Sequence, residues 1–240
     1  MSLSLSKPHA LPPDRSSHIE TPLCVARAMP NRLVIVRHGE SEANILQKLW
    51  RKGALRSVSE ELQNLPNREF RLTELGRKQS DLTGPWLARE YPTGFDVVLV
   101  SDFVRAMETA GRVCLAAGWG NISIEQDPKL AERNWGGFNQ ATQEEQKRFM
   151  DLRERNPIHG HMPDGETLLS TRTRARILLE RCSREYGGKN VLVFGHGEFI
   201  EALWAEIAHL STETQKALFQ SKAGSINNCQ VVEFSSVSTS

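Results

Sequence analysis

Three short runs of apolar, mostly β-branched residues constrain the fold of this chain more than any other feature. They are Leu33–Val36, Val97–Val100 and Val191–Phe194, and longer stretches of helical character separate them. A run that is apolar at every position, rather than at alternate ones, is typical of a strand covered by helices on both faces. The sequence therefore predicts an α/β fold, a three-layer sandwich whose mostly parallel central sheet is flanked by helices.

The remaining elements follow from weaker patterns. Two shorter runs, Ile122–Glu125 and Gln230–Phe234, predict further strands nearer the edges of the sheet. A helical stretch is expected after each central strand, the first of them following a polar turn. The helices are expected over Leu72–Tyr91, with Thr73 as N-cap, over Arg105–Ala117, which stops at Gly118, over Glu144–Arg155 and over Glu198–His209.

The first 30 residues differ from the rest in composition. They hold five prolines among serines and mixed charges and lack apolar periodicity, so residues 1–30 are expected to form a flexible arm. Residues 31–240 are then expected to form a single catalytic domain, a size that can bury a full core. The function of the arm, if it has one, is not legible in its sequence.

The charge balance and the cysteine pattern limit the expected partners and the expected cellular compartment. With 30 Lys and Arg against 29 Asp and Glu, no net field attracts nucleic acid or an anionic membrane, so neither is an expected partner. The four cysteines are far apart and form no CxxC pair, which favours free thiols in a reducing compartment. No apolar run is long enough to span a bilayer, and we expect a cytoplasmic protein.

Polar residues suited to phosphate chemistry follow each of the three strong runs. In open α/β sheets ligands bind beyond the carboxyl ends of the strands, so these residues are expected to meet at one edge of the sheet. They are Arg37, His38, Gly39, Glu40 and Ser41 after the first run, Ser101, Asp102 and Arg105 after the second, and Gly195, His196 and Gly197 after the third.

Arginine and histidine at this edge suit phosphoryl transfer. Arg37 and Arg105 present planar forks of donors that match phosphate oxygens. Their positive charges should also lower the pKa of a nearby histidine, which keeps a neutral nitrogen of His38 available for attack on phosphorus. Glycines beside both histidines, including Gly197, should let the backbone approach the ligand, and the following helix starts can face an anion. A leaving alkoxide needs a proton, and Glu132 is the candidate general acid.

Six blocks in this order resemble the histidine phosphatase superfamily, which includes the phosphoglycerate mutases and many small phosphatases. The resemblance covers about residues 33–232. The blocks are Arg37-His38-Gly39-Glu40-Ser41 with Asn44, Leu72-Thr73 with Gly76 and Gln79, Ser101-Asp102 with Arg105-Ala106 and Glu108-Thr109-Ala110, Leu130 with Glu132-Arg133 and Gly136, Gly165-Glu166-Thr167, and Gly195-His196-Gly197.

The resemblance implies roles for these residues. His38 would take the phosphoryl group, Arg37, Arg105 and His196 would form the phosphate pocket, and Glu132 would donate the proton to the leaving group. Asn44 would contact the phosphate as well. The resemblance also implies that no metal takes part, and no cofactor is expected. The pair His159 and His161 falls short of the three or four ligands that a metal site needs.

Departures from the family pattern bear on the substrate. The stretch from Glu132 to His196 is short compared with that of the mutases, which favours a phosphatase acting on a small phosphorylated metabolite. A basic segment with Lys48, Arg51, Lys52 and Arg56, and the loop with His159 and His161, lie where the family builds specificity. The basic segment either grips a second acidic group or forms a solvated helix face. Trp135 is expected near the pocket because it follows Glu132 closely.

Several alternatives stay open at this stage. The chain could be a mutase that passes the phosphoryl group to a second hydroxyl, or a phospho-ligand binding protein that keeps the fold without catalysis. A P-loop nucleotidase is excluded, since no GxxxxGK[ST] run is present. A homodimer is compatible with the sequence, which names neither the physiological substrate nor the oligomeric state.

Overall fold

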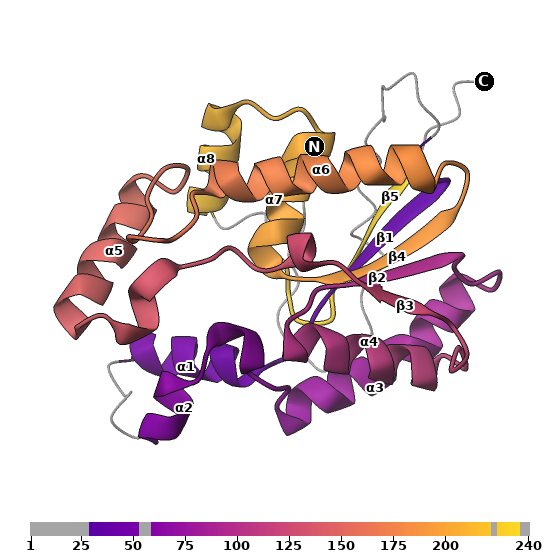
Figure 1. The fold of residues 1–240 in the computed structure, drawn as a ribbon, viewed down its shortest axis with the longest axis horizontal. Helices are drawn as coiled ribbons and strands as arrows, with labels where there is room; N and C mark the ends of the chain where they lie inside the picture. Colours follow the sequence, from indigo (N-terminus) through magenta and orange to yellow (C-terminus); the bar gives the residue numbers. More distant parts are fainter. Residues whose placement is uncertain (1–28, 53–58, 222–224, 236–240) are drawn as a thin grey trace.

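The computed structural model describes residues 29–52, 59–221 and 225–235, and its centre is a five-stranded sheet (Figure 1). The strand order is β3-β2-β4-β1-β5. The first four of these strands run parallel, and β5 pairs antiparallel to β1 at the edge. The strands span Arg32–Arg37 (β1), Val97–Val100 (β2), Ile124–Gln126 (β3), Asn190–Gly195 (β4) and Val231–Ser235 (β5).

The three apolar runs of the sequence are the three central strands. β4 lies between β1 and β2, with Val191 opposite both Leu33 and Val97. The two weaker runs form the edge strands. The first was expected over Ile122–Glu125, but the paired strand β3 begins two residues later, at Ile124. The predicted α/β sandwich with a mostly parallel sheet is therefore confirmed.

Helices cover both faces of the sheet. Alternate residues of β1 divide between two cores: Leu33 and Ile35 pack with α6 and α7, while Val34 and Val36 pack with α3 and α4. Both faces being buried explains why these strands are apolar at every position. The helices span Glu42–Arg51 (α1), Glu60–Asn64 (α2), Glu74–Glu90 (α3), Val104–Ala116 (α4), Gln143–Arg155 (α5), Leu168–Glu185 (α6), Gly197–Ile207 (α7) and Thr212–Ser221 (α8).

The predicted helices begin and end close to the expected residues. The Thr73 hydroxyl accepts a hydrogen bond from the Gly76 backbone N–H at the start of α3, and Gly118 with φ of 79° follows the end of α4. Three helices, the short α2 and the longer α6 and α8, were not predicted. In α6 the buried face includes the small residues Thr171, Ala175 and Cys182, which give a weak apolar signal.

The termini of the described chain lie close to the sheet. Residues 1–28 of the predicted arm lie outside the described residues, but its last two residues pack on the domain: Pro30 is buried, and the Met29 carbonyl accepts a hydrogen bond from the Gly188 backbone N–H. Within the described ranges, no helix has the length and apolar character that crossing a bilayer requires. Figure 1 shows α1, α2 and α5 grouped at one end of the molecule, beyond the sheet.

Candidate active site

His38 lies directly beyond the carboxyl end of β1 and is 2 % exposed. Its Nδ1 is 2.7 Å from the Gly39 carbonyl oxygen. Because a carbonyl can only accept, Nδ1 carries the hydrogen, and the lone pair of the neutral ring is on Nε2. That Nε2 lies 3.3 Å from Nε of Arg105. The nitrogen that could attack phosphorus is thus held next to a guanidinium group.

A second buried imidazole, His196, reaches the same place from β4. Its ring centroid is 5.1 Å from that of His38, and its Nε2 is 2.9 Å from the Ser101 hydroxyl at the end of β2. Its buried Nδ1 has no hydrogen-bond partner within the described part of the chain. The carboxyl ends of three neighbouring strands therefore bring two imidazoles and a hydroxyl together.

Two arginines complete this group. Arg37 donates from Nη1 to the Ile226 carbonyl at 2.5 Å, and Arg105 donates from Nη1 to the Asn67 carbonyl at 2.6 Å. Burial lowers the pKa of Arg105 to about 10, so it stays charged at neutral pH. We call Arg37, His38, Arg105 and His196 the strand-end floor.

The electrostatics of the strand-end floor favour a neutral nucleophile. Burial is the main cause that lowers the pKa of His38 well below its usual value, and the charges of Arg105 and Arg37 lower it further. The pKa of His196 is lowered in the same way, by burial first and then by Arg105. The sequence anticipated the effect of the two arginines but not that burial outweighs them.

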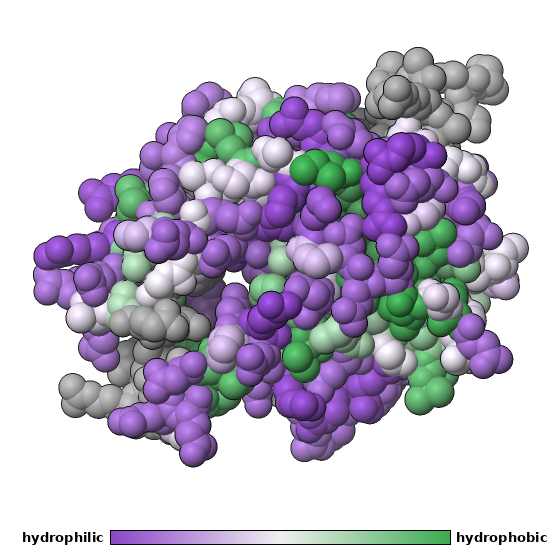
Figure 2. Space-filling model, viewed as in Figure 1, coloured by the Kyte–Doolittle hydropathy of each residue, from purple (hydrophilic) through white to green (hydrophobic). Residues whose placement is uncertain are grey.

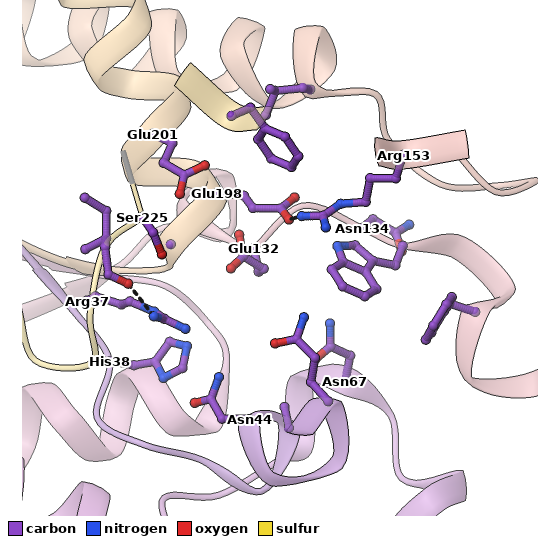
Figure 3. A pocket seen from close by; sticks show the side chains of 18 of the residues that line it. Arg37, His38, Asn44, Asn67, Glu132, Asn134, Arg153, Glu198, Glu201 and Ser225 are labelled. Atoms are coloured by element: carbon purple, nitrogen blue, oxygen red, sulfur yellow. Dashed lines mark hydrogen bonds and ion pairs between the residues drawn. The ribbon is translucent and has the colours of Figure 1, made fainter. Parts of the chain in front are cut away.

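Two further predicted residues lie beside the strand-end floor. The side-chain oxygen of Asn44 accepts from the Ser41 backbone N–H at 3.0 Å and from the Asn228 amide at 3.2 Å, and its amide nitrogen faces the cavity (Figure 3). Gly197 begins α7, and a Cβ there would lie 3.4 Å from Nε of Arg37. The missing side chain lets the guanidinium lie over the helix N-terminus.

Gly39 has a role beyond the one expected of it. A Cβ on Gly39 would lie 2.5 Å from the Gly76 carbonyl oxygen, and a Cβ on Gly76 would lie 1.9 Å from the Glu40 carbonyl oxygen. The loop after β1 and the first turn of α3 therefore pack backbone against backbone. This close packing by itself requires a glycine at position 39.

Glu132 lies across the cavity from the strand-end floor (Figure 3). It follows a short 3-10 helix, Pro128–Leu130, and its Oε1 accepts from the Arg133 backbone N–H at 3.0 Å. Burial, followed by the charge of Glu198, raises the pKa of Glu132, and the opposing pull of Arg37 and Arg105 is weaker. A carboxyl whose protonated form is favoured in this way can donate a proton.

Two arginines, Arg133 and Arg174, hold the Glu132 loop in place, and the sequence did not predict this role. Arg133 is not a solvated surface residue but is 1 % exposed. Its guanidinium donates to the backbone carbonyls of Glu166, Pro157 and Gly160. Arg174 donates to the Ala131 carbonyl at 2.8 Å. These bonds fasten the Glu132 loop to the segment between α5 and α6.

Two more glutamates, also missed, project from the first turns of α7. Glu198 pairs with Arg153 of α5 and lies 3.7 Å from Nη1 of Arg133. Glu201 lines the same cavity one turn further along. We call Glu132, Glu198 and Glu201 the acidic wall (Figure 3). The available signal was the presence of glutamates at i and i+3 on an otherwise apolar helix that directly follows His196.

The strand-end floor and the acidic wall enclose a pocket of about 630 Å³. Figure 2 shows the surface hollowed at this place, between α1, α5 and α7. The lining includes six predicted site residues, namely Arg37, His38, Asn44, Arg105, Glu132 and Gly197, while His196 lies behind His38. Lys48, Arg51 and Trp135 also line it, whereas Lys52, His159 and His161 do not; Arg56 lies outside the described residues.

Metal ligands are scarce in this region. Across the described ranges no three side chains of His, Cys, Asp or Glu are placed to hold an ion together. Nδ1 of His161 lies 2.8 Å from the carbonyl oxygen of His159, so this pair interacts locally on its loop. At the strand-end floor the positive charge comes from two guanidinium groups.

Comparison with known proteins places the chain in a family. The model of the histidine phosphatase superfamily (branch 1) matches residues 33–235, and the chain belongs to this superfamily. The chain is 32% identical over 192 residues to 2,3-bisphosphoglycerate-dependent phosphoglycerate mutase 2 of Gloeobacter violaceus, covering 75% of this chain and 77% of that protein. A mutase of the same kind from Methylorubrum extorquens is 30% identical, covering 79% and 85% of the two chains.

Solved structures with this fold include phosphatases. A mycobacterial glucosyl-3-phosphoglycerate phosphatase superposes with a TM-score of 0.63 at 22% identity, covering 85% of this chain and 90% of that one. A phosphoserine phosphatase from Entamoeba histolytica gives a TM-score of 0.58 at 19% identity with the same coverage. These structures confirm the phosphoglycerate mutase-like fold, and the superfamily contains both mutases and phosphatases.

Proposed function

We propose that this chain is a phosphomonoesterase that works through a phosphohistidine on His38. The observation that carries the proposal is a buried, neutral His38 whose Nε2 lone pair faces the pocket region and accepts a hydrogen bond from Nε of Arg105. Arg37, Arg105 and the Asn44 amide provide donors for the phosphate oxygens, His196 supports His38 from behind, and no step requires a metal ion or a cofactor.

In the first half of the reaction Nε2 of His38 attacks phosphorus. The N–P bond forms as the bond from phosphorus to the ester oxygen breaks, and Glu132 gives its proton to that oxygen, so that a neutral alcohol leaves. The two guanidiniums stabilise the charge on the equatorial phosphate oxygens. In the second half a water molecule attacks phosphorus, the Glu132 carboxylate takes its proton, and the N–P bond breaks to release orthophosphate and restore His38.

A mutase is the alternative that the named relatives support. The short segment between Glu132 and His196 favours the phosphatase. The acidic wall favours it as well, because a phosphoglycerate carboxylate would find no free positive charge among these glutamates. The experiment incubates the full chain with 3-phosphoglycerate and 2,3-bisphosphoglycerate, and separately with p-nitrophenyl phosphate. We expect orthophosphate from p-nitrophenyl phosphate, in EDTA as well, and little 2-phosphoglycerate.

Three outcomes would contradict this proposal. Formation of 2-phosphoglycerate faster than release of orthophosphate from any ester would identify a mutase. Stoichiometric binding of phosphate esters with no turnover of any of them would identify a binding protein. Loss of activity in EDTA that zinc or magnesium restores would contradict the metal-independent chemistry.

A further inference from the structure

The pocket extends well beyond the space that a phosphate group needs. Its volume of about 630 Å³ is in the range that holds drug-sized ligands rather than three-carbon metabolites. From the acidic wall onward the face of α7 lines it with Trp204 and Ala205, and α8 adds Leu218 and Phe219. Trp135 and Phe138 line the side toward α5, with ring centroids 5.3 Å apart. A patch of aromatic and aliphatic side chains therefore lies beside the place of the leaving alcohol, with polar side chains such as Gln146 and Gln215 at its border.

Of the positive side chains that the structure describes in this part of the pocket, Arg153 and Lys48 already have partners. The Arg153 guanidinium pairs with Glu198 and lies over the rings of Trp135 and Phe219, at 4.9 and 4.8 Å from their centroids. Lys48 pairs with Glu40 at 2.5 Å. Arg51 lies exposed at the end of α1, where solvent and salt weaken its attraction for an anion. Within the described ranges, a second acidic group on a substrate would find no buried and unpaired counter-ion here.

Glu201 strengthens this argument. Among the described residues it has neither a hydrogen bond nor an ion pair, and in Figure 3 its carboxyl lies with those of Glu132 and Glu198. Burial, followed by the charges of Glu198 and Glu132, raises its pKa to about 8. At neutral pH Glu201 is therefore largely protonated, so it neither balances an arginine nor serves as a counter-ion for a carboxylate on the substrate.

We propose that the natural substrate is the phosphate monoester of a bulky, apolar alcohol without an acidic group, whose body lies against Trp204, Leu218 and Phe219. This inference rests on the proposed phosphomonoesterase activity and replaces the small metabolite expected from the sequence. Arg37 and Arg105 hold the phosphate, and the apolar part of the pocket selects the alcohol by burying it.

The first test uses ethyl, butyl and hexyl phosphate, because these esters have leaving groups of similar basicity. Burying one methylene is worth about a fourfold gain, so kcat/KM should rise by about two- to fourfold per methylene. The gain should lie mainly in KM, because the alkyl chain is buried equally in the bound ester and in the transition state. A kcat/KM that is constant or falls along the series would overturn the inference.

The second test compares hexyl phosphate with the phosphate monoester of 6-hydroxyhexanoic acid, which has the same chain length and one added carboxylate. We expect kcat/KM at least about tenfold lower for the acid, the cost of an unpaired charge. Glu201→Lys should supply the missing counter-ion and narrow this gap, whereas Glu201→Gln should not. A preference for the acid in the unmodified protein would overturn the inference whether or not the variants fold.

A variant pair locates the apolar contact. Leu218→Asn makes the lining polar at similar volume and should reduce the ratio of kcat/KM between hexyl and ethyl phosphate by about threefold or more. Leu82→Asn is the matched control, because Leu82 is 53 % exposed on α3 and does not line the pocket. An unchanged ratio in Leu218→Asn would exclude this wall as the binding surface for the alcohol.

The outcomes separate the two proposals. If no ester is hydrolysed, p-nitrophenyl phosphate included, the phosphomonoesterase function itself fails. If p-nitrophenyl phosphate and ethyl phosphate are hydrolysed but longer chains bring no gain, only the inference about the alcohol fails.

Discussion

The strand-end floor and the acidic wall face each other across one pocket but are built in different ways. Each residue of the strand-end floor ends a strand of one sheet, directly follows a strand or lies in the first turn of the next helix, so strand pairing sets its neighbours. The acidic wall is assembled from a loop and from α7, and it is held by arginines that reach backbone carbonyls and carboxylates far away in sequence. The comparison teaches that the phosphate end of such a site is fixed by topology, while the leaving-group end depends on side-chain contacts.

The largest effect is expected in the strand-end floor. His38→Ala removes the nucleophile and should lower kcat by about 10³-fold or more for every ester, whatever its leaving group. Rapid quenching of the unmodified protein with substrate should trap an acid-labile, base-stable phosphoryl group on His38. His159→Ala, on a loop away from the pocket, is the control. Full turnover by His38→Ala would refute the nucleophile.

A smaller and selective effect is expected at the acidic wall. Glu132→Gln should lower kcat for alkyl phosphates by about 10²–10⁴-fold, the usual worth of a positioned general acid. p-Nitrophenyl phosphate should lose much less, since its leaving group departs without a proton. Glu144→Gln, on the exposed face of α5, is the control. Equal losses on both esters would make Glu132 a phosphate-positioning residue, and no loss would remove it from the site.

The comparison also predicts that the acidic wall needs its internal arginine for stability. Arg133→Met leaves the carbonyls of Glu166, Pro157 and Gly160 without their buried donor and takes one of two arginines from Glu198, so it should lower the free energy of unfolding by about 3–5 kcal/mol. Arg148→Met, which breaks an exposed pair with Glu144, should change it by less than about 1 kcal/mol. Denaturant unfolding measures both, and similar values for the two would show that Arg133 does not hold the wall.

The smallest effect concerns Glu201. Its folded-state pKa, about 8, is raised above the unfolded value, so the folded state holds an extra proton between roughly pH 4.5 and 8, and stability falls as pH rises through this window. Glu201→Gln removes this loss. The difference in free energy of unfolding between the variant and the unmodified protein should therefore favour the variant by about 1–3 kcal/mol more at pH 8 than at pH 5. The exposed Glu180→Gln is the control. A stability difference that does not vary with pH would contradict an unpaired, buried Glu201.

Much of the strand-end floor could be predicted from sequence because local patterns carry it. The three apolar runs define the central strands, and the carboxyl ends of parallel strands meet at one edge, so His38, Arg105 and His196 could be brought together without coordinates. The same reasoning could not detect that burial dominates the lowered pKa of His38, because burial depends on everything that packs around the ring.

The acidic wall was decided by tertiary structure. From the sequence alone Arg133 is expected to pair with Glu132 at the surface, but in the structure backbone carbonyls of residues 157–166 surround its guanidinium. Arg153 contacts Glu198 only because α5 packs near α7. These partners lie 24 to 45 positions apart, beyond the reach of helix or strand periodicity. The sequence by itself determined the central strands of the sheet, the polar residues that follow each of them and the phosphate end of the pocket. The packing of distant segments decided its size, its charge and the apolar space for the leaving group, because those depend on which side chains meet.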